Sequence, residues 1–273
     1  MGNVGILIVT YNPNMSDFRQ NLDYIRKLEQ TVLIVDNGSK EEIREEMATL
    51  VDNELVFLKC LEENMGIGYA QNVGLKTFTD KKYIFFLDQD SYIEKNKFDK
   101  LVLDFEDLLT HDKNAVMLGP ALDLAGHKMN SGKGIKLVDK VISSGSLMAL
   151  DALKTVGFMR DKYFIDFIDY EWCWRANRLG KHIYQDNNVE MQHETDGVPR
   201  KNGHTIDSLF RLFYIFRNGT FLIVHEKISG TVKIKLLIRL LGKLLFQFSL
   251  KNSCKRIYIC FKGIFFGIFS NLK

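Results

Sequence analysis

The chain has 273 residues with a formal net charge of only +3, and its 46% apolar and 26% charged residues exclude a disordered or collagen-like protein. Its four cysteines form neither a dense disulfide framework nor a zinc-binding CxxC pair, which favours a reducing compartment. The N-terminus lacks the pattern of a signal peptide and no apolar run reaches the ~18 residues that span a bilayer, so we expect a cytoplasmic protein without a transmembrane helix.

Strands and helices are predicted to alternate over the first ninety residues. Continuous apolar runs predict strands at residues 4–9, 32–35, 55–58 and 83–87. Ser16 is expected to cap the first helix, and Ser39 with Glu42 forms a capping box for a helix that reaches about residue 51. This alternation is typical of βαβ units, so we expect an α/β fold with a mostly parallel central sheet flanked by helices.

The second half of the sequence is less regular. We expect a helix near 97–109, a strand at 115–118, a loop or hairpin over 119–140, and an apolar strand over 141–150 interrupted by Ser143-Ser144-Gly145-Ser146. Asp151 is placed to cap the next helix. Further predicted elements are a helix at 170–179 that Gly180 ends, short strands at 182–184 and 189–192, and amphipathic helices from residue 206 onward.

The predicted strand at 83–87 ends in two carboxylates, Asp88 and Asp90. Ligands of open α/β sheets bind beyond the carboxyl ends of the strands, so these side chains fall where a ligand would lie. Paired carboxylates repel each other, and Mg²⁺ or Mn²⁺ relieves this repulsion while also binding substrate phosphates. The pattern predicts a metal site, and the alternative is that both residues only cap a turn.

The three preceding strands also end in small polar residues and glycines. These residues are Thr10, Tyr11, Asn12, Asp36, Asn37, Asn64, Gly66, Gly68 and Asn72. Their polar groups suit a base and a ribose, and glycine permits close backbone approach, so together they predict a nucleotide pocket. The glycines alone equally suit a tight turn that opens a helix. The sequence lacks both the dinucleotide fingerprint GxGxxG after its first strand and a GxxxxGK[ST] loop, which disfavours hydride transfer and P-loop phosphoryl transfer.

Six segments follow one another along the chain, namely VTYNP, VDNGS, ENMGIGYAQNVGL, FFLDQDS, ISSGSLM and FIDFIDYEWCWRA. In this order they resemble the glycosyltransferase family 2 enzymes of the GT-A fold, and within them the bacterial rhamnosyltransferases. The resemblance covers roughly residues 4–220. It implies inverting transfer of a sugar from a nucleoside diphosphate donor. It also implies that Asp88 and Asp90 hold the metal on the donor diphosphate, and that Asp36 reads the nucleotide.

The resemblance assigns the base that deprotonates the acceptor to Asp169, which lies two residues before a Glu-Trp pair. Inversion in one displacement requires a single base on the acceptor side. The helix predicted from Tyr170 would favour the ionised carboxylate by ~0.3–1 kcal/mol through its dipole. By capping preference alone Asp169 is an N-cap, and Asp166 and Glu171 are its rivals for the role of base.

The resemblance also suggests residues that contact the two sugars. Glu171 and Trp172 would shape the acceptor pocket, with Trp172 stacking on a sugar, although a core position suits a tryptophan at least as well. Ser144 and Gly145 resemble the segment that lines the donor-sugar pocket, and the alternative for them is an edge-strand turn.

Two further residues could contact the diphosphate. His193 matches a family histidine that completes the metal or diphosphate site, and the alternative is a surface or core histidine. Arg217 lies in text that resembles the family pattern RYY..RN, together with Arg211, Tyr214 and Asn218. It would pair with a phosphate or tie its helix to the body of the protein.

The end of the chain is basic and amphipathic. Glu226 is the last acidic residue, and ten of the 37 basic residues follow it. Apolar residues at helical spacing lie among these cations, which is typical of helices in a membrane interface with anionic lipid. Nucleic acid is the rival anion, but no nucleic-acid motif accompanies the charge, and an oligomerisation helix is the other alternative. We expect a catalytic domain at 1–226 and a membrane-associating extension at 227–273.

These features together predict a metal-dependent inverting glycosyltransferase on the cytoplasmic face of the cell membrane. The resemblance indicates dTDP-L-rhamnose as the donor and a lipid-linked cell-surface polysaccharide as the acceptor. The alternatives are a transferase for another nucleotide sugar of the UDP-hexose type, a sugar-phosphate nucleotidyltransferase, or a scaffold that binds sugar nucleotides without turnover. Nucleotidyltransferases carry a Gly- and Arg-bearing loop after the first strand, whereas this chain has Thr10-Tyr-Asn-Pro13.

Overall fold

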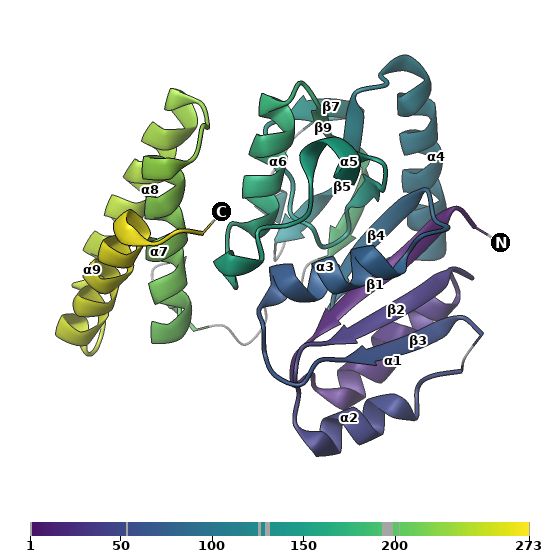
Figure 1. The fold of residues 1–273 in the computed structure, drawn as a ribbon, viewed down its shortest axis with the longest axis horizontal. Coiled ribbons are helices and arrows are strands. Elements are labelled where there is room, and N and C mark those ends of the chain that lie inside the picture. Colours follow the sequence, from purple (N-terminus) through teal and green to yellow (C-terminus); the bar gives the residue numbers. More distant parts are fainter. Residues whose placement is uncertain are drawn as a thin grey trace.

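The computed structural model describes residues 2–52, 54–124, 127–128, 132–192, 199–201 and 203–272. The chain forms an α/β body around one large sheet, and three C-terminal helices stand beside this body (Figure 1). The predicted fold class, a mostly parallel sheet flanked by helices, is confirmed. His193, which the sequence suggests as a metal ligand, lies outside the described residues.

The four N-terminal strands are parallel to one another. They are β1 (Val4–Thr10), β2 (Thr31–Asp36), β3 (Val56–Cys60) and β4 (Tyr83–Asp88), in the order β3-β2-β1-β4. The connecting helices are α1 (Met15–Arg26), α2 (Glu41–Ala48) and α3 (Ile67–Thr77). Side chains of β1, β2 and β4 contribute to two hydrophobic cores, so these strands are covered on both faces as their aliphatic runs predict.

The register of these strands brings their carboxyl ends to one edge of the sheet. Thr10 pairs with Asp36, and Val9 pairs with Asp88. The backbone N–H of Asn37 donates to the Thr10 carbonyl at 2.8 Å, which holds the segment after β2 against the end of β1. Polar residues from distant parts of the sequence therefore become neighbours at this edge.

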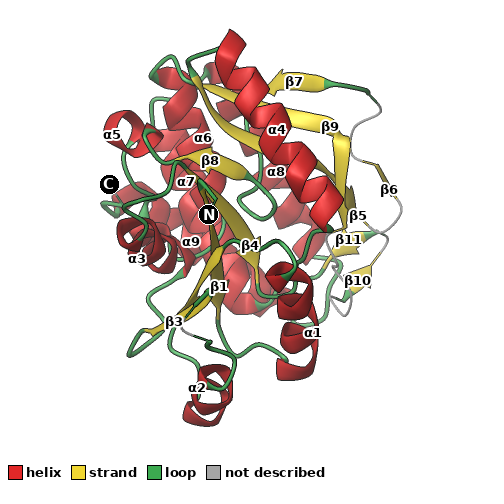
Figure 2. Cartoon of the chain, turned by 90° about the vertical axis from the view of Figure 1, so that its right-hand side faces the viewer, coloured by secondary structure: helices red, strands yellow, loops and turns green. Residues whose placement is uncertain are grey.

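The second half of the sheet mixes strand directions. β8 (Leu147–Ala149) is antiparallel to β4 and to β5 (Ala115–Leu124), while β9 (His182–Gln192) is parallel to β5 and antiparallel to β7 (Ile135–Val138). Shorter pairs join β6 (His127–Lys128) to β5 and β10 (Arg200–Lys201) to β11 (His204–Thr205). Figure 2 shows α4 (Lys95–His111) across these strands. After β8 come α5 (Ala152–Val156), a 3₁₀ turn at Asp161–Tyr163, and α6 (Ile168–Arg178).

Several predicted helix caps are wrong. Ser39 does not cap α2, because its hydroxyl donates to the carboxylate of Asp36. Ser16 does not cap α1, since Asn14 is the N-cap and accepts the Ser16 backbone N–H at 3.0 Å. Asp151 precedes α5 but makes no side-chain cap bond. In the first two cases another polar side chain competes for the same local hydrogen bonds.

Some element boundaries also differ from the predictions. β5 continues to Leu124 and β9 runs unbroken from His182, because the two strands pair in parallel on both sides of an irregularity between Pro120 and Ala121. Within the predicted strand at 141–150, the paired residues are those of β8. α6 begins at Ile168, so Asp169 lies in its first turn rather than before it.

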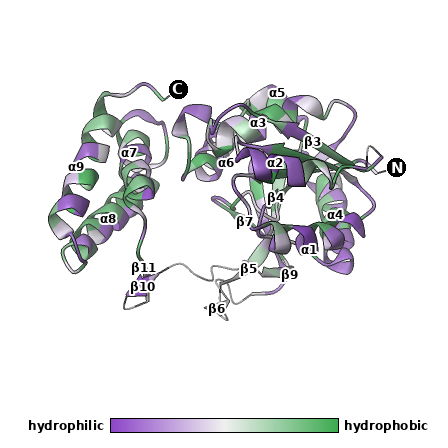
Figure 3. Cartoon of the chain, turned by 90° about the horizontal axis from the view of Figure 1, so that it is seen from below, coloured by the Kyte–Doolittle hydropathy of each residue, from purple (hydrophilic) through white to green (hydrophobic). Residues whose placement is uncertain are grey.

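The C-terminal helices form a bundle of α7 (Leu209–His225), α8 (Gly230–Gln247) and α9 (Ser253–Phe269). Gly263 allows α9 to contact the backbone of α7, because a Cβ there would lie 2.7 Å from the Phe213 carbonyl oxygen. Figure 3 shows α6 facing this bundle, and both hydrophobic and hydrophilic residues along α8 and α9. The predicted domain boundary after residue 226 falls between α7 and α8 and stays a prediction. Within the described ranges, no helix is long and apolar enough to cross a membrane.

Candidate active site

A cavity of about 710 Å³ opens at the carboxyl ends of β1 and β4. Three parts of the chain line it. The first is the set of loops that follow β1 to β4, the second comprises residues 142–144 and 164–170, and the third comes from residues 205–215 with two side chains of α8. The cavity therefore lies where the α/β body meets the C-terminal bundle.

The cavity brings together many residues that the sequence suggests for the site. Those in its lining are Thr10, Tyr11, Asn37, Asn64, Gly66, Asp88, Asp90, Ser144 and Asp169. Except for Ser144 and Asp169, all of them belong to the first four strands and the loops after them. The parallel register explains this convergence, because it aligns the ends of β1, β2 and β4.

Asn37 and Asn64 form a hydrogen-bonded pair at the cavity wall. The Asn37 amide donates to the Asn64 side-chain oxygen at 2.9 Å, and that oxygen also accepts the Gly66 N–H at 3.0 Å. Gly66 has a φ of +89°, and a Cβ there would lie 2.6 Å from the Cα of Phe164. The glycine thus allows α3 to start directly against the segment that leads to Asp169.

Asp36 and Asn12 do not line the cavity but hold the loops that do. Asp36 is fully buried and accepts hydrogen bonds from the Thr10 hydroxyl at 3.2 Å and the Ser39 N–H at 2.9 Å. Asn12 accepts the Lys40 N–H at 3.0 Å, which ties the loop after β1 to the start of α2. The nucleotide-reading role suggested for Asp36 stays a prediction. In this structure Asp36 is a buried residue that holds the loop after β2 by hydrogen bonds.

Asn72, Gly68 and Gly145 also lie outside the lining. Asn72 is buried and exchanges two 2.9 Å hydrogen bonds with the backbone of Met159. Gly68 lies against the 3₁₀ turn, because a Cβ there would be 3.0 Å from the Arg160 carbonyl oxygen. Gly145 has a φ of +80° in the turn before β8. Each of them shapes the backbone behind the cavity.

Arg217 ties its helix to the body, which is one of the two roles considered for it. Its guanidinium donates to the carbonyl oxygens of Lys162 at 2.7 Å and Tyr163 at 2.9 Å, and it does not line the cavity. Asn218 is fully buried beside it and donates to three carbonyl oxygens in residues 163–166. These bonds fix a segment in which Phe164, Asp166 and Phe167 all have positive φ.

Glu171 and Trp172, suggested for the acceptor, are core residues here. Glu171 is 2% exposed and is held by Arg175 at 2.8 Å. Trp172 is fully buried, and its indole N–H donates to the Gly157 carbonyl at 2.9 Å. Neither side chain lines the cavity. Trp172 therefore occupies a core position in this structure, which is the alternative to stacking on a sugar.

Asp88 and Asp90 place two carboxylates at one end of the cavity. The Ser144 hydroxyl accepts the Asp88 N–H at 3.2 Å, and the intervening Gln89 accepts the Tyr11 N–H at 2.8 Å. The described residues contain no group of three or more His, Cys, Asp or Glu side chains placed to hold a metal. Two carboxylates nevertheless fit Mg²⁺ or Mn²⁺, because such ions take their other ligands from substrate phosphates and water.

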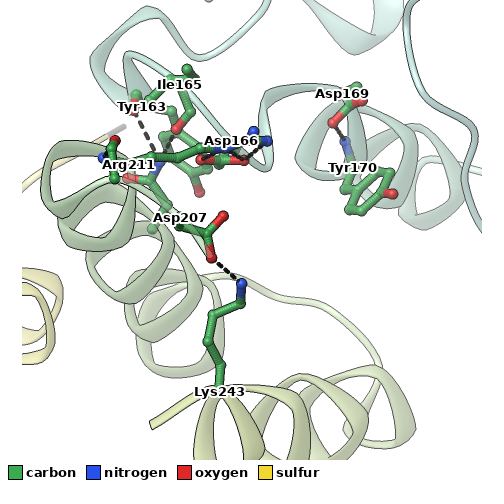
Figure 4. Close-up of polar contacts among 10 residues, drawn as sticks. Tyr163, Ile165, Asp166, Asp169, Tyr170, Asp207, Arg211 and Lys243 are labelled. Carbon is green, nitrogen blue, oxygen red and sulfur yellow. Dashed lines mark hydrogen bonds and ion pairs between the residues drawn. The ribbon is translucent and has the colours of Figure 1, made fainter. Parts of the chain in front are cut away.

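Asp169 lies in the first turn of α6 and faces the cavity. Its carboxylate accepts the Tyr170 N–H at 2.8 Å (Figure 4) and the Ser143 N–H at 3.4 Å. Burial is the main cause that raises the pKa of Asp169 to about 6. The negative charges of Asp88 and Asp166 also raise this pKa, whereas the hydrogen bonds from the two N–H groups lower it. A carboxylate with this pKa is ionised at neutral pH but binds a proton readily, which suits a general base.

Several side chains that line the cavity are not assigned to the site by the sequence patterns, namely Gln71, Gln89, Asp207, Arg239 and Lys243. Gln71 and Gln89 lie inside the sequence segments that carry the family resemblance. Those segments therefore contain a signal for both residues. The three residues from 207 to 243 carried no such signal. They reach the cavity because the bundle packs beside α6, which is a long-range contact that local sequence does not specify.

Two ion pairs lie at this cavity. One joins the bundle to the body, and the other joins α8 to the segment that precedes α7. Arg211 of α7 holds Asp166 at 2.9 Å, and Lys243 of α8 holds Asp207 (Figure 4). The pKa of Arg211 is raised, first of all by its hydrogen bonds to Asp166. The Arg211–Asp166 pair fixes the position of the segment before Asp169 relative to α7.

Comparison with known proteins gives consistent results. Residues 5–112 match the family model of glycosyl transferase family 2. A dTDP-rhamnosyl transferase RfbF of Shigella flexneri is 29% identical over 256 residues, which cover 85% of this chain and 84% of that protein.

Solved structures share the fold. S. aureus TarS 1–349 in complex with UDP-GlcNAc has a TM-score of 0.62 at 15% identity, covering 96% of this chain and 79% of that one. GalNAc-T7 with UDP, GalNAc and Mn²⁺ has a TM-score of 0.60 at 13% identity, covering 81% of this chain and 49% of that one. At these identities the similarity concerns the fold.

Proposed function

We propose that this chain, a glycosyltransferase of the GT-A fold whose residues 5–112 match the family 2 model, transfers L-rhamnose from dTDP-L-rhamnose to a saccharide acceptor with inversion. The observation that carries the proposal is the cavity, which places two carboxylates at the strand ends and a single carboxylate, Asp169, at the start of α6. The rhamnosyl donor is supported by the relative named as a dTDP-rhamnosyl transferase.

The donor occupies the end of the cavity near the strand ends in this proposal. Thr10, Tyr11, Asn37 and Asn64 offer hydroxyl, aromatic and amide groups to the nucleoside there. Asp88 and Asp90 would hold a divalent cation, which would supply Lewis-acid stabilisation of the departing diphosphate. Ser144, beside Asp88, is placed to contact the donor sugar.

Asp169 acts on the acceptor. Its carboxylate takes the proton of the acceptor hydroxyl while that oxygen forms a bond to the anomeric carbon. The bond from the anomeric carbon to the diphosphate breaks, and dTDP leaves with the electron pair. Attack from the face opposite the leaving group inverts the anomeric centre and requires only this one base.

A panel of nucleotide sugars tests the proposed donor. With Mg²⁺ or Mn²⁺ present, we expect consumption of dTDP-L-rhamnose with release of dTDP, and a kcat/KM at least about tenfold lower for UDP-glucose and UDP-GlcNAc, since their sugars present different hydroxyl groups and uridine lacks the thymine methyl group. Formation of dTTP and sugar 1-phosphate when inorganic pyrophosphate is added would indicate a nucleotidyltransferase instead. Binding of dTDP-L-rhamnose without any product would leave only a non-catalytic scaffold.

The C-terminal helices support attachment to a membrane surface. On α8 the exposed apolar residues are Ile234, Leu237, Ile238, Leu241, Leu245 and Phe248, and on α9 they are Tyr258, Phe261, Phe265, Phe266, Ile268 and Phe269. No acidic residue follows Glu226, so every charged side chain of α8 and α9 is a cation. We therefore propose that the chain docks on the anionic cytoplasmic face of the cell membrane, where a lipid-linked polysaccharide precursor would be its acceptor.

Vesicle binding tests this attachment. Replacing both Leu237 and Leu241 by glutamine removes apolar surface that would enter the bilayer, so we expect binding to vesicles with 30% anionic lipid to weaken about tenfold or more. Leu103→Gln on α4, which is more exposed than either leucine but lies on the body, is the control. Equal binding by the double variant, the control and the native chain in a flotation assay would refute membrane docking through α8.

A further inference from the structure

One wall of the cavity carries two cations that the transfer step does not require. Arg239 and Lys243 lie four residues apart on α8, hence on one face of the helix, and both line the cavity. We infer that this wall binds a phosphate of the acceptor, in the form of a lipid-linked diphosphate held at the level of the membrane headgroups. The inference rests on the proposed function, because it names the chemistry of that acceptor.

The charges in the cavity leave Arg239 available for a ligand. Arg211 is paired with Asp166, and Lys243 is paired with Asp207. Within the described part of the chain Arg239 makes no ion pair, and its contact is with the Phe167 ring, whose centroid lies 5.8 Å from the guanidinium carbon. An exposed arginine stacked on an aromatic ring keeps its fork of N–H donors free, and that fork matches a phosphate bidentately.

The position of Arg239 favours the acceptor over the donor. Phe167 and Tyr170 flank Asp169 in sequence, and all three line the cavity. Burial raises the pKa of Tyr170 to about 12, and Arg239 is among the charges that oppose this rise, which places it near Tyr170. The donor diphosphate belongs with Asp88 and Asp90 at the strand ends, so an anion beside Arg239 and the base belongs to the acceptor.

The rest of α8 indicates why this anion would be part of a lipid. By helical periodicity, the exposed apolar stripe from Ile234 to Leu245 lies on the face opposite Arg239 and Lys243. A helix is about 10 Å across, and an interfacial helix buries its apolar face ~5–10 Å below the headgroup boundary. If the stripe enters the bilayer, the opposite face therefore lies at the depth of the lipid phosphates.

A binding experiment without sugar or turnover tests the inference. The full chain is saturated with dTDP and Mg²⁺ to fill the donor site, and farnesyl diphosphate is titrated by calorimetry. We expect Arg239→Gln to weaken farnesyl diphosphate binding at least about tenfold, in line with a lost charge-assisted bidentate contact. Lys255→Gln, which removes an exposed cation of α9 outside the cavity, should change the affinity less than twofold.

Inorganic pyrophosphate and farnesol separate the possible sources of binding. Weaker binding of both than of farnesyl diphosphate supports a lipid-linked diphosphate. Pyrophosphate binding as tight as that of farnesyl diphosphate would overturn the lipid part, and unchanged affinity in Arg239→Gln would overturn the site. If the variant instead loses affinity for dTDP, Arg239 serves the donor and the inference is wrong. The titration involves no sugar and no turnover, so its outcome does not depend on whether L-rhamnose is the sugar that is transferred.

Discussion

Replacing Asp169 by asparagine is expected to lower kcat for sugar transfer by roughly two to four orders of magnitude, the range that a general base contributes. Asparagine has the same shape and can still accept the Tyr170 N–H, but it cannot take the proton of the acceptor hydroxyl. Affinity for dTDP should stay nearly unchanged, because the donor groups lie at the strand ends. Steady-state kinetics and dTDP titration of the same preparation provide both measurements.

The pH dependence of the native enzyme gives an independent check on this base. Burial raises the pKa of Asp169 to about 6, so kcat/KM should fall tenfold per pH unit below that value as the carboxylate becomes protonated. A divalent cation bound at Asp88 would offset one charge that raises this pKa, so the inflection should lie at or below pH 6. The residual kcat/KM of Asp169→Asn should not show this decrease below pH 6.

Stability distinguishes a base from a helix cap. Since the folded-state pKa of Asp169 is raised above its unfolded value, its carboxyl group stabilises the fold at low pH, and this contribution is lost as pH rises through about 6. Asp169→Asn should therefore not lower the free energy of unfolding at pH 7.5, as measured by urea denaturation. A large loss of stability, absent from the exposed control Asp161→Asn, would show that Asp169 serves the helix rather than the reaction.

The donor end of the cavity was predictable because its signal is local. Residues such as Thr10, Asn37 and Asp88 directly follow aliphatic strands, and parallel strands that pair in register must end at one edge. The strands themselves follow from continuous apolar runs that bury both faces. The family resemblance then adds Asp169 and Ser144, which the structure places in the same cavity.

The sequence pattern alone could not distinguish residues that face the cavity from residues that lie behind it. Asp36, Asn72, Glu171 and Trp172 occur in the same segments as lining residues, but their side chains point into the protein interior. That direction depends on packing between elements, such as Trp172 against the Gly157 carbonyl. Similarly, the charge and the apolar spacing of the tail predict membrane association, whereas its contribution to the cavity depends on how the bundle docks beside α6.

The second large effect is expected at the carboxylate pair. Asp88→Asn should lower kcat/KM by roughly 100-fold or more, because a neutral amide binds a hard divalent cation far more weakly than a carboxylate does. Asp90→Asn should act in the same direction, since Asp90 lines the same end of the cavity. The native enzyme should lose activity in EDTA and recover it with Mg²⁺ or Mn²⁺.

Direct metal binding separates this role from a structural one. In the presence of dTDP, Mn²⁺ binding followed by electron paramagnetic resonance should show one site in the native chain and a markedly weaker one in either variant. Asp99→Asn, an exposed aspartate paired with Lys95 on α4, is the matched control and should keep both activity and Mn²⁺ affinity. Native activity that survives EDTA would exclude a metal-dependent mechanism. Unchanged Mn²⁺ affinity in Asp88→Asn and Asp90→Asn would place the metal elsewhere.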